Sequence, residues 1–207
     1  MGGNQVIGDY TSGQKIIFGA TFAGATFDGA GNFIVNSNLG MLAIQNARDK
    51  IIDLSDGAGN TFVTAYEATN PGVIDFRMAA GYEIVSGSSM GADVIFAGNG
   101  SSQLWGGWDN AADVFVGGYG TDVFMCGRFF GGDAVLNAAS NDVVSVIDST
   151  LSDIVATGSD GMGNVAIAFN TGNFITFQSS ELVSAAVVFA DGVALRYNHV
   201  TQSWQGA

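Results

Sequence analysis

The amino-acid sequence predicts an all-β protein whose centre is a short parallel β-solenoid (β-roll), and three observations lead to that class. Glycine supplies 31 of the 207 residues while proline occurs once. Hydrophobic residues make up 47% of the chain, which is too many for a disordered protein. Such a chain is typical of many short strands joined by tight turns. The third observation is a repeat in the middle of the chain, and it decides how the strands are arranged.

Three successive blocks of twenty residues align without a gap, at 86–105, 106–125 and 126–145. Each block holds two short alternating segments, such as ADVFV and TDVFM in the second block. Their shared positions are the glycines Gly87, Gly107 and Gly127, the aspartates Asp93, Asp113 and Asp133, and the turn residues Ser102, Asp122 and Asp142. A constant period predicts a stack of layers, here called rungs, each of which holds two strands and two turns. Each strand of a rung pairs in parallel with its counterpart twenty residues along the chain. Val94, Val114 and Ala134 should then lie on neighbouring strands of one sheet.

Two flanks rich in β-hairpins are predicted on either side of this roll. The expected division is 1–85 for the N-terminal flank, 86–145 for the roll and 146–207 for the C-terminal flank or cap. Asp-Gly turns between alternating apolar residues occur in FDGAGNFIV (27–35), SDGAGNTFV (55–63), SDGMGNVAI (159–167) and FADGVALRY (189–197). This pattern predicts hairpins. The similar spacing of the turns indicates two copies of one module, at about 10–65 and 143–198.

The formal charge of −13 argues against nucleic acid and anionic membranes as partners and favours cations. The single cysteine, Cys126, excludes an internal disulfide framework. The first ten residues, MGGNQVIGDY, do not resemble a secretory signal. No apolar run is long enough to predict a transmembrane segment.

GGYGTDVFM (117–125) fits the nine-residue pattern G-G-x-G-x-D-x-U-x, in which U is apolar. On this motif the chain resembles the RTX (hemolysin-type calcium-binding) family over about half its length. AGNGSSQLW (97–105) and NAASNDVVS (137–145) are degenerate copies, and the alternate turns depart from the family by two extra residues. VIGDYTSGQKIIF (6–18) is similar to the segment that often follows RTX arrays, although Gln14 and Lys15 stand where an acidic residue is usual.

The resemblance implies structural Ca²⁺ between the stacked loops 97–102, 117–122 and 137–142. Carboxylates and backbone carbonyls would supply the oxygen ligands, which a hard cation prefers. The implied ligands are Asp122, Asp142, Gly117, Tyr119, Asn99 and Gly100. The alternative is that polar and apolar turn contacts have replaced the metal. For Asp93, Asp113 and Asp133 we expect hydrogen bonds to their own turn amides rather than a second row of ions.

Family resemblance also implies a bacterial extracellular or cell-surface protein exported by type I secretion, whose signal is C-terminal and uncleaved. The acidic chain would then stay unfolded in a calcium-poor cytoplasm and fold outside as ions bind. The flank similarity indicates that the chain could be a segment of a longer parent protein, in which case other domains of that parent are possible partners.

No enzymatic activity is expected. His199 is the only histidine, which excludes a Ser-His-Asp triad that needs a second one and a histidine-based zinc site. We expect His199 on the surface and Cys126 as a buried thiol. Trp105 is expected in the core, and Trp108, Phe129 and Phe130 are expected to pack across the rungs. The alternative for these aromatic residues is stacking on carbohydrate.

Two classes of function remain. The first is a structural or self-assembling module of a surface layer, filament or adhesin stalk. The second is a module that binds a carbohydrate or a partner protein, or that serves secretion or anchoring of a larger protein. Self-association is favoured because only 12% of the residues are charged and the only lysines, Lys15 and Lys50, lie in the N-terminal flank. Charged edge residues, lysine above all, normally oppose strand-to-strand association.

Overall fold

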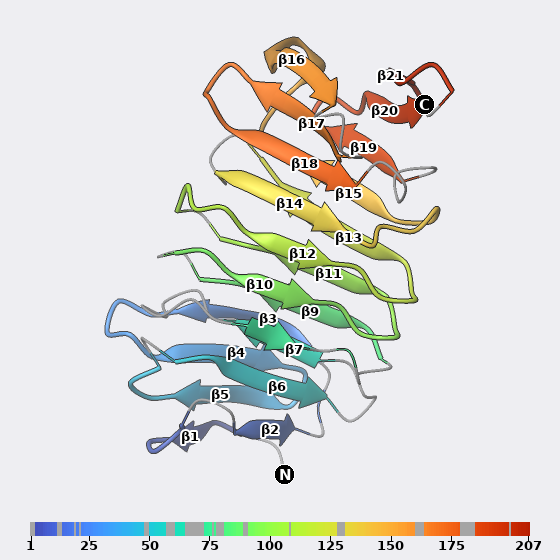
Figure 1. Cartoon of the computed structure of the whole chain (residues 1–207). Coiled ribbons are helices and arrows are strands. Elements are labelled where there is room, and N and C mark those ends of the chain that lie inside the picture. The colour runs from blue at the N-terminus through green and yellow to red at the C-terminus, as the bar shows by residue number, and fades with distance from the viewer. Residues whose placement is uncertain are drawn as a thin grey trace.

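The computed structural model shows a protein built almost entirely from β-strands, as the sequence predicts. Figure 1 shows the strands stacked in layers from the N-terminal to the C-terminal end. The structure describes residues 3–11, 14–18, 20, 22–47, 50–56, 61–64, 73–75, 77, 81–88, 91–107, 109–127, 131–159, 164–178, 185–198 and 200–207. One short 3-10 turn, η1 (Leu151–Asp153), is the only helical element of this part of the chain.

The strands form three sheets. The first has the order β1 (Gln5–Ile7), β5 (Gly40–Ile44), β4 (Phe33–Ser37), β3 (Phe22–Phe27). The second has the order β16 (Ile154–Ser159), β17 (Asn164–Phe169), β18 (Phe174–Gln178), β14 (Gly132–Leu136), β12 (Val114–Val116), β10 (Val94–Phe96), β8 (Val73–Asp75). The third has the order β2 (Lys15–Phe18), β6 (Ile52–Asp56), β7 (Thr61–Thr64), β9 (Glu83–Ser86), β11 (Ser102–Trp105), β13 (Asp122–Cys126), β15 (Val143–Val146), β19 (Ala186–Phe189), β20 (Ala194–Asn198), β21 (Ser203–Gly206).

In the centre, successive strands of each sheet pair in parallel with the predicted shift of twenty residues. Val94 lies opposite Val114, and Val114 lies opposite Ala134. In the other sheet Ser102 lies opposite Asp122. The predicted register is therefore confirmed. Parallel pairing also extends one rung beyond the predicted start, because β8 pairs with β10 and β9 pairs with β11.

The sheets taken as wholes are mixed, although the described strands of the roll pair with one another in parallel, as predicted. Antiparallel hairpins continue the same sheets at either end, and all four Asp-Gly segments connect such hairpins, as predicted: β3/β4, β6/β7, β16/β17 and β19/β20. The hairpins add to the parallel strands because the outer edge of a parallel strand accepts an antiparallel partner equally well.

The two ends of the chain share one pairing pattern, in which β1 to β7 correspond in order to β14 to β20, so the second copy begins within the predicted roll. In each set the third, fourth and fifth strands form an antiparallel meander, and the first strand pairs in parallel with the fifth. The second strand pairs in parallel with the sixth, which forms a hairpin with the seventh. The flanks are therefore alike in topology as well as in sequence.

Alternation along the central strands buries every second residue between the two sheets. Ile95, Phe115 and Val135 from one sheet meet Leu104, Phe124 and Val144 from the other, and all six side chains are at most 1% exposed. The Phe115 and Phe124 ring centroids are 6.2 Å apart. A separate cluster in the N-terminal flank includes Phe33, Ile44 and Leu54. Each rung contributes few core residues, so its stability depends on the neighbouring rungs.

Candidate functional site

The first column of polar residues in the centre consists of Asp93, Asp113 and Asp133, all of them buried. Two of these carboxylates accept a backbone N–H of the preceding rung: Asp113 Oδ1 accepts the N–H of Asp93 at 2.8 Å, and Asp133 Oδ1 accepts the N–H of Asp113 at 3.1 Å. Asp93 also accepts the N–H of Ser88, in the turn that precedes it. The expectation of hydrogen bonds to the residues' own turns is thus only partly right, because the carboxylates also join the rungs.

Burial changes the acidity of this column. It raises the pKa of Asp113 to about 7 and that of Asp133 to about 8, because desolvation disfavours the charged form. The backbone N–H groups oppose the rise, and the neighbouring charges of Asp93 and Asp109 add to the rise at Asp113. Cys126 is fully buried, as expected, and burial raises the pKa of its thiol, which is hydrogen-bonded to Asp133.

The second column runs along the RTX-like turns and consists of Glu83, Ser102, Asp122 and Asp142, again all buried. Asp122 accepts the N–H of Ser102 on Oδ1 at 3.1 Å and the N–H of Gly118 on Oδ2 at 2.7 Å. Asp142 accepts the N–H of Asp122 at 2.8 Å and that of Ala139 at 2.6 Å. Each of these two aspartates therefore joins two rungs and closes its own turn.

Glu83 extends this column by one rung and was not singled out from the sequence. Its Oε2 accepts the Ser102 hydroxyl at 2.9 Å and the Gly98 N–H at 3.2 Å, while Oε1 is buried without a hydrogen-bond partner. Burial raises the pKa of Glu83, which favours the protonated acid. The twenty-residue period does not predict Glu83, because Ser102 pairs with the residue nineteen positions earlier and not twenty.

The predicted calcium ligands lie close together along these turns, but their oxygens face N–H donors. Both carboxylate oxygens of Asp122 accept backbone amides, and the carbonyls of Gly117 and Gly120 accept the side-chain amides of Asn137 and Asn141 at 2.6 and 3.0 Å. A calcium cage needs several oxygens aimed at one point. Within the described ranges, no three His, Cys, Asp or Glu side chains gather in such a group. Calcium binding at these turns stays a prediction.

The turns stack so closely that only glycine fits at certain positions. A Cβ on Gly118 would lie 1.7 Å from the carbonyl oxygen of Gly98, and one on Gly120 would lie 2.1 Å from that of Gly100. Glycine at these two positions therefore allows neighbouring rungs to approach closely, whether or not an ion is bound.

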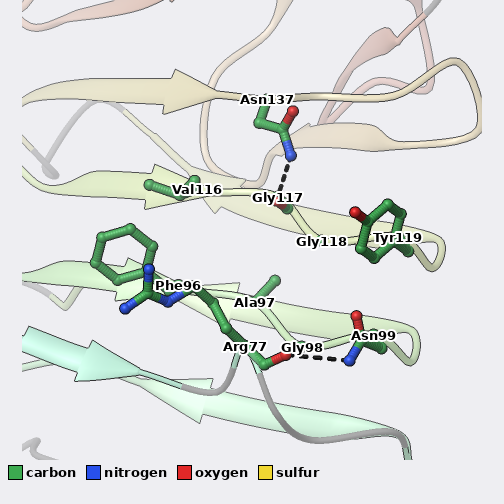
Figure 2. Close-up of a pocket in the computed structure, with 10 residues that line it drawn as sticks. All are labelled: Arg77, Phe96, Ala97, Gly98, Asn99, Val116, Gly117, Gly118, Tyr119 and Asn137. Atoms are coloured by element: carbon green, nitrogen blue, oxygen red, sulfur yellow. Dashed lines mark hydrogen bonds between the residues drawn. The ribbon is translucent and has the colours of Figure 1, made fainter.

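A groove of about 380 Å³ crosses the outer surface of these turns (Figure 2). Tyr119 lies at one end and is 90% exposed. The Arg77 guanidinium lies over the Phe96 ring, 4.7 Å from its centroid. The amide of Asn99 donates to the Arg77 carbonyl at 3.1 Å. Of the predicted ligand residues, Tyr119, Asn99 and Gly117 line this groove, while Arg77 and Phe96 were not singled out from the sequence.

The structure tests one of the predictions made for the aromatic residues, that for Trp105. Trp105 is half-buried on the outward side of β11, and Leu104 takes the inward position, so the core assignment of Trp105 is wrong. Inward and outward positions alternate along a strand, so the residue after the inward-facing Leu104 faces outward. Trp108, Phe129, Phe130 and His199 lie outside the described residues.

No protein-family model matches the chain, and comparison with curated proteins gave no relative. The RTX resemblance therefore rests on the residues quoted above. In the part of the chain that the structure describes, no helix is long and apolar enough to cross a membrane.

Proposed function

We propose that this chain is a non-enzymatic, extracellular structural or self-assembling module built on an RTX-like β-roll. The observation that carries the proposal is the use of the buried carboxylates. In the central rungs these carboxylates accept backbone N–H groups of the preceding rung, so their hydrogen-bonding capacity is used to join rungs. Buried acids held in this way hold an architecture together rather than face a substrate.

The composition of the surface supports association. A soluble domain usually carries about 25% charged residues, about twice the 12% of this chain. With no lysine after Lys50, the later strands lack the side chain that most often prevents edge pairing. The charge of −13 opposes association at low ionic strength, so assembly grows when salt screens the repulsion. A surface layer, filament or adhesin stalk uses such a surface.

Size-exclusion chromatography with light scattering tests this function directly. The full chain is run over a range of concentrations and salt, in calcium and in chelator. Growth of the mass with concentration and salt is the expected result. A chain that stays monomeric under all of these conditions contradicts the proposal and favours the binding function considered below.

Calcium is included in the proposal as a ligand of the loops around Asp122. Calcium should then raise the melting temperature and a chelator should lower it. Asp122→Ala should lower stability even in chelator, because two backbone N–H groups lose their acceptor, and should also remove most of the calcium effect. Asp93→Ala is the matched control, since it removes a buried column carboxylate and should leave the calcium effect intact. An identical melting temperature of the parent chain in calcium and chelator removes the ion from the proposal.

The groove in Figure 2 favours a second candidate function, the binding of a carbohydrate. The exposed Tyr119 ring offers a stacking face, and the Asn99 amide and the Arg77 guanidinium, which lies over Phe96 farther along the groove, are suitable donors for hydroxyl groups. Titration calorimetry with neutral and acidic oligosaccharides tests it. Tyr119→Ala should abolish binding, and Tyr82→Ala, at a tyrosine that is 45% exposed elsewhere, should leave it unchanged. Absence of heat with every oligosaccharide removes this candidate.

A further inference from the structure

The groove beside Tyr119 runs across the stack of rungs rather than along one strand (Figure 2). Its lining takes residues from successive rungs: Arg77 from before the first block, Phe96 and Asn99 from the first block, Tyr119 from the second and Asn137 from the third. Neighbouring strands of a sheet lie about 4.8 Å apart, so an occupant that fills the groove extends over several rungs. The shape therefore suits a chain-like ligand.

Tyr119 gives this groove an aromatic surface. It holds the turn position that Asn99 and Ala139 hold in the neighbouring rungs, and it is 90% exposed. An exposed tyrosine presents a flat apolar face together with a hydroxyl group. A pyranose ring has a similar mixture, because its axial C–H bonds form an apolar face and its hydroxyl groups point outwards from the rim. Tyr119 is therefore suited to stacking on a sugar.

Arg77 gives the same groove a positive charge. It is exposed, and it is the only charged residue among the described residues that line the groove. Its guanidinium lies over the Phe96 ring, 4.7 Å from the centroid, and this stacking orients the planar fork at the surface. A guanidinium binds a carboxylate or sulfate group through two parallel N–H bonds. In a chain with a formal charge of −13, this lining therefore favours an anion locally.

Two buried acids bond to glycines of the groove, but neither reaches its surface. Glu83 accepts the N–H of Gly98 at 3.2 Å, and Asp122 accepts that of Gly118 at 2.7 Å. Both acids are fully buried. Burial also raises the pKa of Glu83, which favours its neutral form. An anion in the groove therefore contacts the Arg77 guanidinium and not a carboxylate.

A peptide is the other chain-like ligand that carries acidic groups. Extended peptides often bind by adding a strand to an open sheet edge. The strands beside the groove offer no such edge, because β10 pairs with β8 and β12, and β12 also pairs with β14. A carbohydrate needs no strand edge, and an aromatic face with planar polar donors is suited to its recognition. The groove therefore favours a sugar over a peptide.

We propose that the groove binds an acidic oligosaccharide. A carboxylate or sulfate group of the ligand accepts hydrogen bonds from the Arg77 guanidinium, and one of its sugar rings stacks on Tyr119. The proposal rests on carbohydrate binding, the second candidate function above, and names the class of sugar. Figure 2 shows the guanidinium and the Tyr119 ring at different places along the groove, so the acid group and the stacked ring belong to different sugar units.

Calorimetric titration of the full chain with pairs of sugars that share a backbone and differ in charge tests the preference. The first pair is a short oligogalacturonate and its methyl ester, and the second is a short dextran sulfate and plain dextran. An ionic strength of about 0.15 M screens the long-range repulsion from the charge of −13. The acidic member should then bind at least about tenfold more tightly than the neutral one. The pair that shows the preference distinguishes carboxylate from sulfate.

Variants of Arg77 test the charge. Arg77→Gln should lower the affinity for the acidic sugar to that for its neutral partner, and Arg77→Lys should restore only part of it, because an ammonium lacks the fork. Both variants keep the backbone carbonyl that accepts the Asn99 amide, so the melting temperature should not change. Arg196→Gln is the matched control, because it removes the same charge at an exposed position of β20, outside the groove. It should leave binding unchanged.

Each other outcome has a definite meaning. Equal binding of acidic and neutral sugars overturns this inference and keeps carbohydrate binding. An equal loss in Arg77→Gln and Arg196→Gln assigns the preference to overall charge and overturns it too. Oligoglutamate that binds more tightly than both acidic sugars identifies a peptide ligand and has the same consequence. If no sugar produces heat, this inference and the carbohydrate-binding function are both wrong.

Discussion

Asp28, in the hairpin turn between β3 and β4, and Asp113, just before β12, both accept backbone N–H groups. Asp28 accepts the N–H groups of Ala30 and Asn32, each at 2.9 Å, and the Asn32 side chain at 2.9 Å. These bonds lower its pKa, the backbone bond from Asn32 most of all. Burial raises the pKa of Asp113 to about 7 despite a bond of the same kind. At Asp113, desolvation therefore outweighs hydrogen bonding, whereas at the exposed Asp28 hydrogen bonding decides the direction of the shift.

The turns around these two aspartates also differ in how closely other parts of the chain pack against them. In the central rungs, backbone from the next rung lies against each turn, as it does at Gly118. Two turns of the flanking hairpins face open space, because a Cβ at Gly29 or Gly172 would meet nothing within 4 Å. Substitutions in the centre should therefore be costly, and similar substitutions in the flanks should be mild.

Gly118→Ala is expected to have the largest effect. Its Cβ would lie 1.7 Å from the Gly98 carbonyl oxygen, so the rungs would have to separate. We expect the free energy of unfolding to fall by about 3 kcal/mol or more. Denaturation in urea measures the change. Gly158→Ala, where a Cβ meets nothing within 4 Å, is the control and should be nearly neutral. Equal effects at the two sites would show that close stacking does not distinguish the regions.

Asp113→Ala should come next. It leaves the N–H of Asp93 buried without its acceptor, which costs about 1–3 kcal/mol. Thermal and urea denaturation at pH 6 measure the loss. Asp28→Ala removes more hydrogen bonds but exposes the freed N–H groups to water, so its effect should be smaller. A larger loss from Asp28→Ala would reverse the ranking and contradict the role assigned to burial.

The pH dependence of stability should follow Asp113 and Asp133. Their folded pKa values of about 7 and about 8 lie above the ordinary value of 3.8. The folded state therefore binds more protons than the unfolded state between pH 4 and 8, and the free energy of unfolding falls as pH rises through that range. The charges of Asp93 and Asp109 add to the rise of the Asp113 pKa, whereas the hydrogen bond from the Cys126 thiol opposes the rise of the Asp133 pKa.

Urea denaturation at intervals from pH 4 to pH 9 measures this slope. Asp133→Asn keeps an acceptor oxygen but cannot ionise, so it should flatten the slope between pH 7 and 8. Stability that rises with pH over this range, in the parent chain, would show that the column is ionised at little cost.

The smallest expected effect is that of Asp28 at low pH. Its folded pKa lies below the ordinary value of 3.8, so its contribution is present above pH 4 and disappears as pH falls further. Asp28→Asn should slightly lower the melting temperature at pH 7 and should leave it unchanged near pH 2. A difference of the same size at both pH values would assign the effect to packing instead of charge.

Much of the fold follows from local patterns. The twenty-residue period places Val94, Val114 and Ala134 in register because identical rungs stack with least distortion. The Asp-Gly turns mark hairpins because glycine next to aspartate suits a reversal of the chain. Glu83 was overlooked because its rung breaks the period, with shifts of nineteen and twenty-one residues to the next one. The groove at Tyr119 was also overlooked, because Arg77 and Phe96 are brought together only by stacking.

The sequence by itself thus determined the strand class, the register of the central rungs and the positions of the hairpins, since these depend on spacing along the chain. Only the tertiary structure decided that the carboxylates of Asp122 and Asp142 accept backbone amides. It also decided that burial raises the pKa of Asp113 to about 7 and that of Asp133 to about 8. The physical reason is that hydrogen-bond partners and desolvation depend on which rungs lie next to one another, and a single rung does not contain that information.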